Sequence, residues 1–208
     1  MYIKTLVVGD YDTNCYILTP DSSIQAIVID PADEPDVILD AIAEKGLDVK
    51  YIILTHGHWD HFGAAKYIAE KTGAKIGIHK LDKKALSDSD LSMAFIFVDH
   101  LDEVKPDMEL SDGQVLKLGD LDAIIIHTPG HTPGGISILI DDCLFTGDLI
   151  FKGSVGRTDL TGGSYETLLN SVKEKVLVLP DRIKIYPGHG PATTIGNERR
   201  QNPFLIGL

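Results

Sequence analysis

The sequence predicts a layered domain that combines helices with β-sheet, of the α/β or α+β class. Apolar runs of four to eight residues alternate with longer stretches of helical periodicity, which is typical of layered folds. Apolar residues make up 43% of the 208 positions, enough for a full hydrophobic core. Because no repeat, low-complexity tract or linker interrupts the pattern, we expect one compact domain over residues 1–208.

The expected strands are short apolar runs bounded by polar or turn residues. The first three follow one another before any helix, so we expect the sheet to begin antiparallel. The predicted strands cover residues 3–8, 14–19, 24–30, 51–55, 75–79, 114–118, 122–127, 135–140, 143–147 and 183–187.

The expected helices show apolar residues at helical spacing. The first, over residues 35–46, has Pro35 at its start and Gly46 at its end, where helices favour these residues. The others cover residues 62–73, 80–88 and 164–179. Residues 86–113 lack clear periodicity; such a segment is either a functional loop or a surface excursion with a short strand.

The charge excludes several kinds of partner. Acidic residues outnumber basic ones by 31 to 19, and the net charge of −12 repels both nucleic acid and anionic lipid. Bound divalent cations would offset this charge locally. The first residues carry no export signal, and no apolar stretch is long enough to span a membrane. We therefore expect a cytoplasmic protein that binds neither nucleic acid nor membrane.

The two cysteines, Cys15 and Cys143, both lie among apolar neighbours. A free cysteine commonly acts as a small core residue, so we expect two buried thiols rather than a disulfide or a nucleophile.

Three histidines and an aspartate gather directly after the predicted strand 51–55. In extended backbone His56 and His58 point to the same side, whereas Asp60 and His61 fall at the turn into the next helix and face a second point. The carboxyl ends of strands are where α/β folds usually place their sites. This spacing is compatible with two neighbouring metal positions.

Further ligand-type residues follow other predicted strands. His131, Asp148 and His189 each come after an apolar run, so we expect them to converge on the same edge as the first cluster. Imidazole and carboxylate without thiolate suit zinc, iron or manganese and exclude a cysteine-rich structural site. We expect two divalent ions, with zinc as the first choice and iron or manganese as alternatives.

The residue types suggest how two ions would be shared. His56, His58 and His131 would hold one ion, Asp60, His61 and His189 the other, and Asp148 would bridge them. Such a pair activates a bridging water for hydrolysis. Asp60 is also expected to orient the bridging hydroxide.

Four other residues near these stretches have less defined roles. Asp30 ends the predicted strand 24–30 and either supports a ligand or caps a turn. His79, His100 and His127 are expected to be surface or hydrogen-bonded core histidines; His127, four residues before His131, is the one best placed to support a ligand.

The motifs "THGHWDH", "GHTPGG", "TGD" and "PGHG", in this order, resemble the metallo-β-lactamase superfamily over nearly the whole chain. The resemblance implies an α+β fold, the αββα four-layer sandwich, with a binuclear site at one edge. The same site serves lactamases, lactonases, thioesterases, nucleases and oxidoreductases.

Several features narrow this range. Asp148 stands at a bridging position that true β-lactamases lack, His58 replaces an acidic residue of the flavin-linked diiron enzymes, and the negative charge opposes a polyanionic substrate. The stretches "GSVGRTDLTGGS" and "PGHGPATTIGNERRQNPF" are similar to short glyoxalase II, the hydroxyacylglutathione hydrolases. This similarity implies hydrolysis of a small thioester of the S-lactoylglutathione type. The longer enzymes add a C-terminal helical domain and a tyrosine after the last histidine, where this chain has Gly190 and Pro191.

Arg157 and Asp159 are the candidate substrate contacts, with Arg157 suited to a substrate carboxylate; the alternative is a surface ion pair between them. Three other functions remain open. One is a persulfide dioxygenase with a single iron held by His56, His131 and Asp148, since that class shares the "GRTD" loop. The others are a hydrolase of another ester or lactone and a non-catalytic metal-binding protein. The sequence does not predict the oligomeric state.

Overall fold

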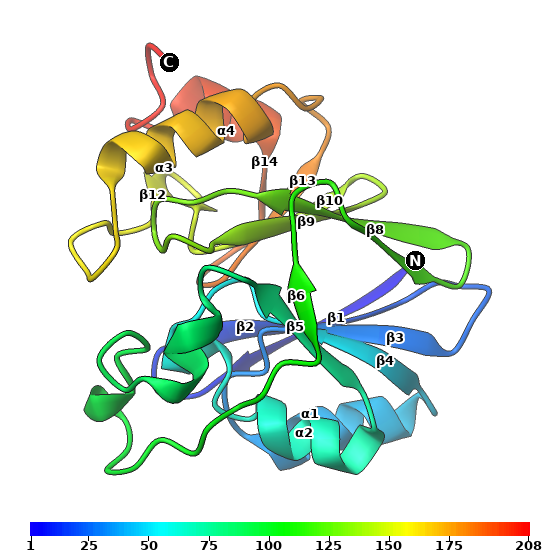
Figure 1. Cartoon of the computed structure of the whole chain (residues 1–208). Helices are drawn as coiled ribbons and strands as arrows, with labels where there is room; N and C mark the ends of the chain where they lie inside the picture. The colour runs from blue at the N-terminus through cyan, green and yellow to red at the C-terminus, as the bar shows by residue number, and fades with distance from the viewer.

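The computed structural model describes all 208 residues, and its layers run helix, sheet, sheet, helix (Figure 1). This is the expected αββα sandwich of the α+β class. The first sheet contains β1 to β6 in sequence order, and the second contains β7 to β10 with β13 and β14. Each sheet with its helices makes up one half of the molecule. The main chain passes from the first half to the second once, through residues 111–114 between β6 and β7.

The first sheet begins antiparallel and ends parallel. Consecutive β1, β2 and β3 pair antiparallel, as the helix-free start of the sequence predicts, and β3, β4, β5 and β6 then pair parallel. Its strands are β1 (Tyr2–Val8), β2 (Thr13–Thr19), β3 (Gln25–Ile29), β4 (Asp48–Ile53), β5 (Lys75–His79) and β6 (Met108–Leu110).

The second sheet has the order β14-β13-β10-β9-β8-β7, with β10 and β13 parallel and the other pairs antiparallel. A separate hairpin, β11 (Ile150–Phe151) with β12 (Ser154–Val155), follows β10. The sheet strands are β7 (Val115–Leu118), β8 (Leu121–His127), β9 (Ile136–Ile140), β10 (Cys143–Gly147), β13 (Lys184–Pro187) and β14 (Thr193–Thr194).

Helices cover the outer face of each sheet (Figure 1). The helices α1 (Pro35–Glu44) and α2 (Ala65–Thr72) lie on the first sheet, and α3 (Tyr165–Ser171) and α4 (Ile195–Gln201) lie on the second. Pro35 begins α1, and Gly46 follows it with a φ of 61°, as the helix punctuation predicts.

The hydrophobic core has three parts, one between each pair of layers. The central part lies between the sheets, where Ile27, Ile29 and Ile53 of the first pack with Ile138 and Phe145 of the second. These strands are apolar on both faces because helices cover one face of each sheet and the opposite sheet covers the other. The rigid double sheet fixes the strand ends from which the site is built.

Some local predictions were wrong. Residues 80–88 form only the 3-10 turn η2 (Lys83–Ser87) rather than an α-helix, because Asp82 turns inward to bind two other loops. The predicted helix 164–179 divides into α3 and the π-helical turn η4 (Val172–Val176). Helix α4 was not predicted; Thr194 caps its first turn by accepting from the Asn197 amide.

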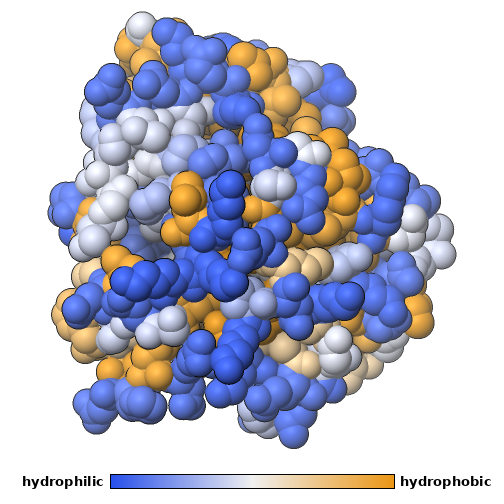
Figure 2. All heavy atoms as spheres, viewed as in Figure 1, coloured by the Kyte–Doolittle hydropathy of each residue, from blue (hydrophilic) through white to orange (hydrophobic).

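The two cysteine thiols differ in burial. Cys15 is fully buried, but Cys143 is only half-buried, contrary to expectation, and both are free. Every helix is too short or too polar to cross a lipid bilayer. Figure 2 shows hydrophilic residues spread over the visible face, with smaller apolar groups between them.

Candidate metal centre

Seven histidine and aspartate side chains meet at one edge of the sandwich, as the positions of the strand ends predict. The loop after β4 supplies four of them, and the loops after β8, β10 and β13 supply one each. They form three overlapping groups, and within each group the donor atoms lie within 4.8 Å of one another. The groups are His56 with His58 and His131, His56 with His61 and Asp148, and Asp60 with His61 and His189.

The first group is made of three buried imidazoles. His58 Nδ1 and His131 Nε2 lie 2.9 Å apart, and the His56 ring is 4.8 Å from each of the other two rings, measured between centroids. The two rings from the β4 loop stand on the same side, which agrees with the alternation of side chains in extended backbone.

The third group, Asp60 with His61 and His189, joins the end of the β4 loop to the loop after β13. His61 Nε2 lies 3.2 Å from His189 Nε2, and Asp60 Oδ2 lies 3.5 Å from the same His189 nitrogen. The main-chain amide of Asn14 donates to the Gly188 carbonyl, which ties this loop to β2. A side chain at position 188 would overlap both Asp148 and His61, so only glycine fits beside the cluster.

Asp148 lies between the first and third groups, and with His56 and His61 it makes up the second. Its Oδ1 is 3.4 Å from His61 Nε2, and its Oδ2 is 3.6 Å from His131 Nε2 and 3.5 Å from His189 Nε2. Each carboxylate oxygen therefore faces histidines, and the residue has the position needed to join two neighbouring cations.

Two polar atoms in the cluster have no hydrogen-bond partner. They are His56 Nε2 and Asp148 Oδ1, and both are buried. Burying such an atom without a partner costs about 1–3 kcal/mol, so proteins rarely leave one unpaired. Both atoms belong to the group made of His56, His61 and Asp148. The residues therefore fit divalent cations, with nitrogen and carboxylate donors of the kind that zinc, iron and manganese accept.

Outer hydrogen bonds orient three of the imidazoles. The Nδ1 atom of His61 donates to Asp30 at 2.9 Å, that of His131 donates to the Arg157 carbonyl at 2.8 Å, and that of His189 donates to the Tyr11 carbonyl at 2.9 Å. With Nδ1 committed as a donor, each ring directs Nε2 into the cluster. Such outer partners fix the ring and its tautomer for metal binding.

Asp30 contacts a ligand-type histidine, as the first of the two roles considered from the sequence requires. Its carboxylate accepts from His61 and from the amide and hydroxyl of Thr55, each of the latter at 2.7 Å. Its backbone turns through a φ of 51°, which aspartate tolerates better than most residues. Thr55 also lies 3.0 Å from His56 Nδ1, so one buried carboxylate positions two ligand-type histidines. Sequence reasoning missed Thr55, although it directly precedes His56.

The electrostatics differ across the cluster. Burial first and neighbouring histidines second lower the pKa of His56 and of His58, the latter to about 4. Burial also opposes a charge on His61, but the carboxylates of Asp148, Asp60 and Asp30 outweigh it and raise the pKa to about 10. For Asp60, burial alone raises the pKa, yet His61 and His189 bring it well below the usual range. A cation that binds His61 through Nε2 therefore displaces a proton there.

A second buried carboxylate, Asp82, holds two of the ligand-bearing loops together. It accepts from the Gly57 amide at 3.0 Å, the Thr132 hydroxyl at 2.6 Å and the Gly134 amide at 2.6 Å. Gly57 lies between His56 and His58, and Thr132 follows His131. The sequence analysis missed this residue; the available signal was its place after β5, at the same edge as the other strand ends.

A cavity of about 500 Å³ opens above the cluster. His58, Asp60, His131, Asp148 and His189 line its base. Residues from the irregular segment 86–113, including Met93 and Phe97, line one wall, and the same segment contains β6, the short strand considered as the alternative.

The remaining predicted residues lie outside the cluster. Arg157 lines the cavity, but its Nε and one terminal nitrogen each donate to Asp159 at 2.8 Å, which is the surface ion pair considered as the alternative. Asp159 is exposed and does not line the cavity; its hydrogen bond with Arg157 lowers the pKa to about 2. His127 stacks on His79 with ring centroids 4.0 Å apart and bonds to the Pro133 carbonyl, so it contacts no cluster residue.

Comparison with known proteins places this site in a family. The profile of the metallo-beta-lactamase superfamily matches residues 8–189. The hydroxyacylglutathione hydrolase GloC of Haemophilus influenzae is 39% identical, with 99% of this chain and 98% of that protein covered.

Solved structures agree with this assignment. The B3 metallo-beta-lactamase BLEG-1 is 35% identical and has a TM-score of 0.93, with 99% of this chain and all of that chain covered. The protein TTHA1623 in a di-iron-bound form is 34% identical and has a TM-score of 0.86, with 97% of this chain and all of that chain covered. With a matching profile, a matching fold and a full-length relative, the chain belongs to the metallo-β-lactamase superfamily.

Proposed function

We propose that this protein is a binuclear metal-dependent hydrolase that cleaves small thioesters of the S-lactoylglutathione type. The observation that carries the proposal is the cluster of seven ligand-type side chains, in which two buried polar atoms lack a partner. The similarity to a hydroxyacylglutathione hydrolase over nearly the full length supports the thioester substrate.

The geometry supports two ions rather than one. His56, His58 and His131 would hold the first, Asp60, His61 and His189 the second, and Asp148 would join them. Zinc is our first choice, and the di-iron-bound form of TTHA1623 supports iron as the alternative. Two such ions supply Lewis-acid activation of water and of the scissile carbonyl.

The chain itself orients the reactants. Asp60 lies in the cavity and its pKa is held well below the usual range, so its carboxylate is ionised and accepts a hydrogen bond from the attacking water. His61 and His189 hold this carboxylate in place. Asp30 and the carbonyls of Arg157 and Tyr11 in turn hold the imidazoles.

The cavity lining favours a thioester over an amide. Outside the cluster its polar side chains are Tyr11, Ser154 and Arg157, and none is of a residue type that titrates near neutral pH. A thiol ionises near pH 8.5, so a thiolate can leave without a proton from the protein. An amine needs a general acid, which the walls do not offer.

Hydrolysis of β-lactams is the second candidate, because the BLEG-1 structure is so similar. A third is the iron-dependent persulfide dioxygenase, which needs one ion held by His56, His131 and Asp148. The group of Asp60, His61 and His189 gives no advantage to a one-ion enzyme.

Metal analysis combined with three assays tests these candidates. Purified protein is analysed for metals per chain, then assayed for S-lactoylglutathione cleavage, for oxygen uptake with glutathione persulfide and for nitrocefin hydrolysis. We expect two ions per chain and thioester cleavage as the fastest reaction. One iron per chain with oxygen uptake, or faster nitrocefin hydrolysis, contradicts the proposal.

A further inference from the structure

Beyond the cluster, the walls of the cavity are mostly apolar. One wall carries Tyr11, Met93, Ile96 and Phe97, and the opposite wall carries Phe151, Val155 and Leu160. The only other lining residues outside the cluster are Ser154 and Arg157. A substrate bound over the cluster therefore contacts apolar side chains on both sides.

The first wall is built from two segments that contact each other. The 3-10 turn η3 (Ala94–Ile96) packs against the turn between β1 and β2 through the rings of Tyr11 and Phe97, whose centroids are 5.0 Å apart. Just before η3, the carbonyl of buried Ser92 accepts from the Trp59 amide at 2.8 Å, next to Asp60. The wall is thus joined directly to the ligand-bearing loop.

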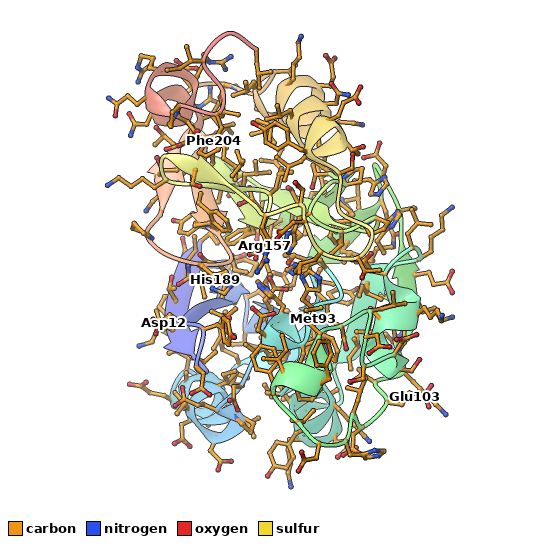
Figure 3. All side chains as sticks on the ribbon, turned by 90° about the vertical axis from the view of Figure 1, so that its left-hand side faces the viewer. Asp12, Met93, Glu103, Arg157, His189 and Phe204 are labelled. Carbon is orange, nitrogen blue, oxygen red and sulfur yellow. The ribbon has the colours of Figure 1, made fainter.

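The opposite wall comes from the hairpin β11–β12, which directly follows Asp148. Its turn is fixed from behind, where the Gly153 amide donates to Glu198 at 2.8 Å and Asn202 donates to the Ser154 carbonyl at 2.9 Å. Figure 3 shows Met93 and Arg157 facing each other from the two halves, with His189 beside them. Both walls therefore have fixed positions relative to the cluster.

Exposed apolar side chains on the first wall are available to contact an apolar ligand. Tyr11 and Ile96 each keep 53% of their surface exposed although they lie beside the cluster. Such exposure at a cavity marks a binding surface, because burying it against a ligand is favourable.

The walls above the cluster offer no free positive charge to an anionic group. Arg157 is its only basic residue besides the histidines, and Asp159 already neutralises it through two hydrogen bonds. The chain as a whole carries −12. An uncharged group suits these walls better than a carboxylate does.

We propose that the two walls bind the acyl group of the substrate and that this group is apolar, either aliphatic or aromatic. This proposal rests on the proposed function and adds the substrate class. Apolar acyl thioesters are then cleaved in preference to S-lactoylglutathione. Burial of each added methylene raises kcat/KM by roughly fourfold until the walls are filled.

A series of thioesters tests the substrate class. Thioesters of glutathione and of N-acetylcysteamine with acetyl, butanoyl, hexanoyl and lactoyl groups are assayed by thiol release with the metal-loaded enzyme. From acetyl to hexanoyl, which adds four methylenes, we expect kcat/KM to rise by up to about 250-fold on both carriers. A flat or falling series, or lactoyl as the best acyl group, overturns this inference while the proposed function stands. No cleavage of any thioester refutes the proposed function itself.

Two neighbouring residues of η3 provide a matched pair of variants. Ile96 lines the cavity, whereas Phe95 does not, and their exposures are similar at 53% and 58%. We expect Ile96→Ser to lower the hexanoyl-to-acetyl ratio of kcat/KM by about fivefold. Phe95→Ser is the control and leaves the ratio unchanged. Equal effects of the two substitutions contradict the assignment of this wall.

Binding without turnover gives an independent measurement. Trp59, the only tryptophan, shares a neighbouring cavity with Ile96 and Phe97, so its fluorescence reports on this wall. We expect S-hexylglutathione, a thioether that cannot be hydrolysed, to bind at least tens of times more tightly than S-methylglutathione. Equal affinities of the two thioethers overturn the proposal.

Discussion

Replacing Asp82 by asparagine tests whether this buried carboxylate holds the two histidine loops together. Its Oδ1 accepts from the Gly134 amide, and its Oδ2 accepts from the Thr132 hydroxyl and the Gly57 amide. An asparagine has one acceptor and one donor in these places. Whichever way the amide turns, at least one buried backbone N–H then faces another N–H.

The expected cost follows from these contacts. An unpaired buried N–H costs about 1–3 kcal/mol, and the remaining bonds lose the strength that a charged acceptor gives them. We therefore expect the free energy of unfolding to fall by about 2–4 kcal/mol. The loops would also hold His58 and His131 less firmly, so metal affinity is expected to fall by about 10- to 100-fold.

Urea denaturation measures the first effect and competition with a chelator of known affinity measures the second. Asp102→Asn is the matched control, because its side chain is 77% exposed and it removes the same charge. The denaturant dependence of the unfolding free energy is expected to be unchanged, since the surface exposed on unfolding is the same. If Asp82→Asn differs from the control by less than about 0.5 kcal/mol, the three hydrogen bonds do not stabilise the loops as we reason.

Three further results are expected. Asp148→Ala is expected to bind one ion in place of two and to lose more than about a hundredfold in kcat, because it lacks the carboxylate that would join the two ions. Metal analysis and steady-state kinetics measure these effects, and a variant with wild-type turnover contradicts the bridging role of Asp148. Asp159→Asn frees Arg157 and is expected to lower KM by about threefold for thioesters whose carrier has a carboxylate, an effect that salt removes; an unchanged KM shows that Arg157 does not meet the carrier. Burial raises the pKa of Cys15, so above about pH 9 unfolded chains release a proton that folded chains keep. The free energy of unfolding therefore falls by up to about 1.4 kcal/mol per pH unit, and Cys15→Ala is expected to lack this contribution. If the free energy of unfolding falls equally with pH in the two proteins, Cys15 does not link folding to proton binding.

The ligand-type residues could be predicted from sequence because each lies in a loop that follows an apolar strand. His131, Asp148 and His189 are far apart in the chain, yet strand ends at one edge of a sandwich bring them together. The pattern of apolar strands in the sequence thus indicates where these residues lie in the fold. The same reasoning applies to Asp30, which directly follows β3 and contacts His61.

Contacts between segments of irregular structure could not be predicted in this way. Asp82 follows β5 by three residues, and its partners lie in two other loops, so no periodic pattern marks it. Met93 and Phe97 line the cavity only because η3 folds back on the turn that contains Tyr11. The sequence also left open whether Arg157 pairs with Asp159 or awaits an anion, since that depends on side-chain geometry.

The single passage of the chain between its two halves means that cation binding and the docking of those halves are linked. His56, His58, Asp60 and His61 belong to the half that ends at β6, and His131, Asp148 and His189 belong to the half that begins at β7. Each ion would thus be bound by residues from both halves, which are joined covalently only through residues 111–114. A cut at residues 111–114 would leave two fragments whose reassembly free metal would favour, in addition to the apolar core between the sheets, because each ion would take donors from both fragments.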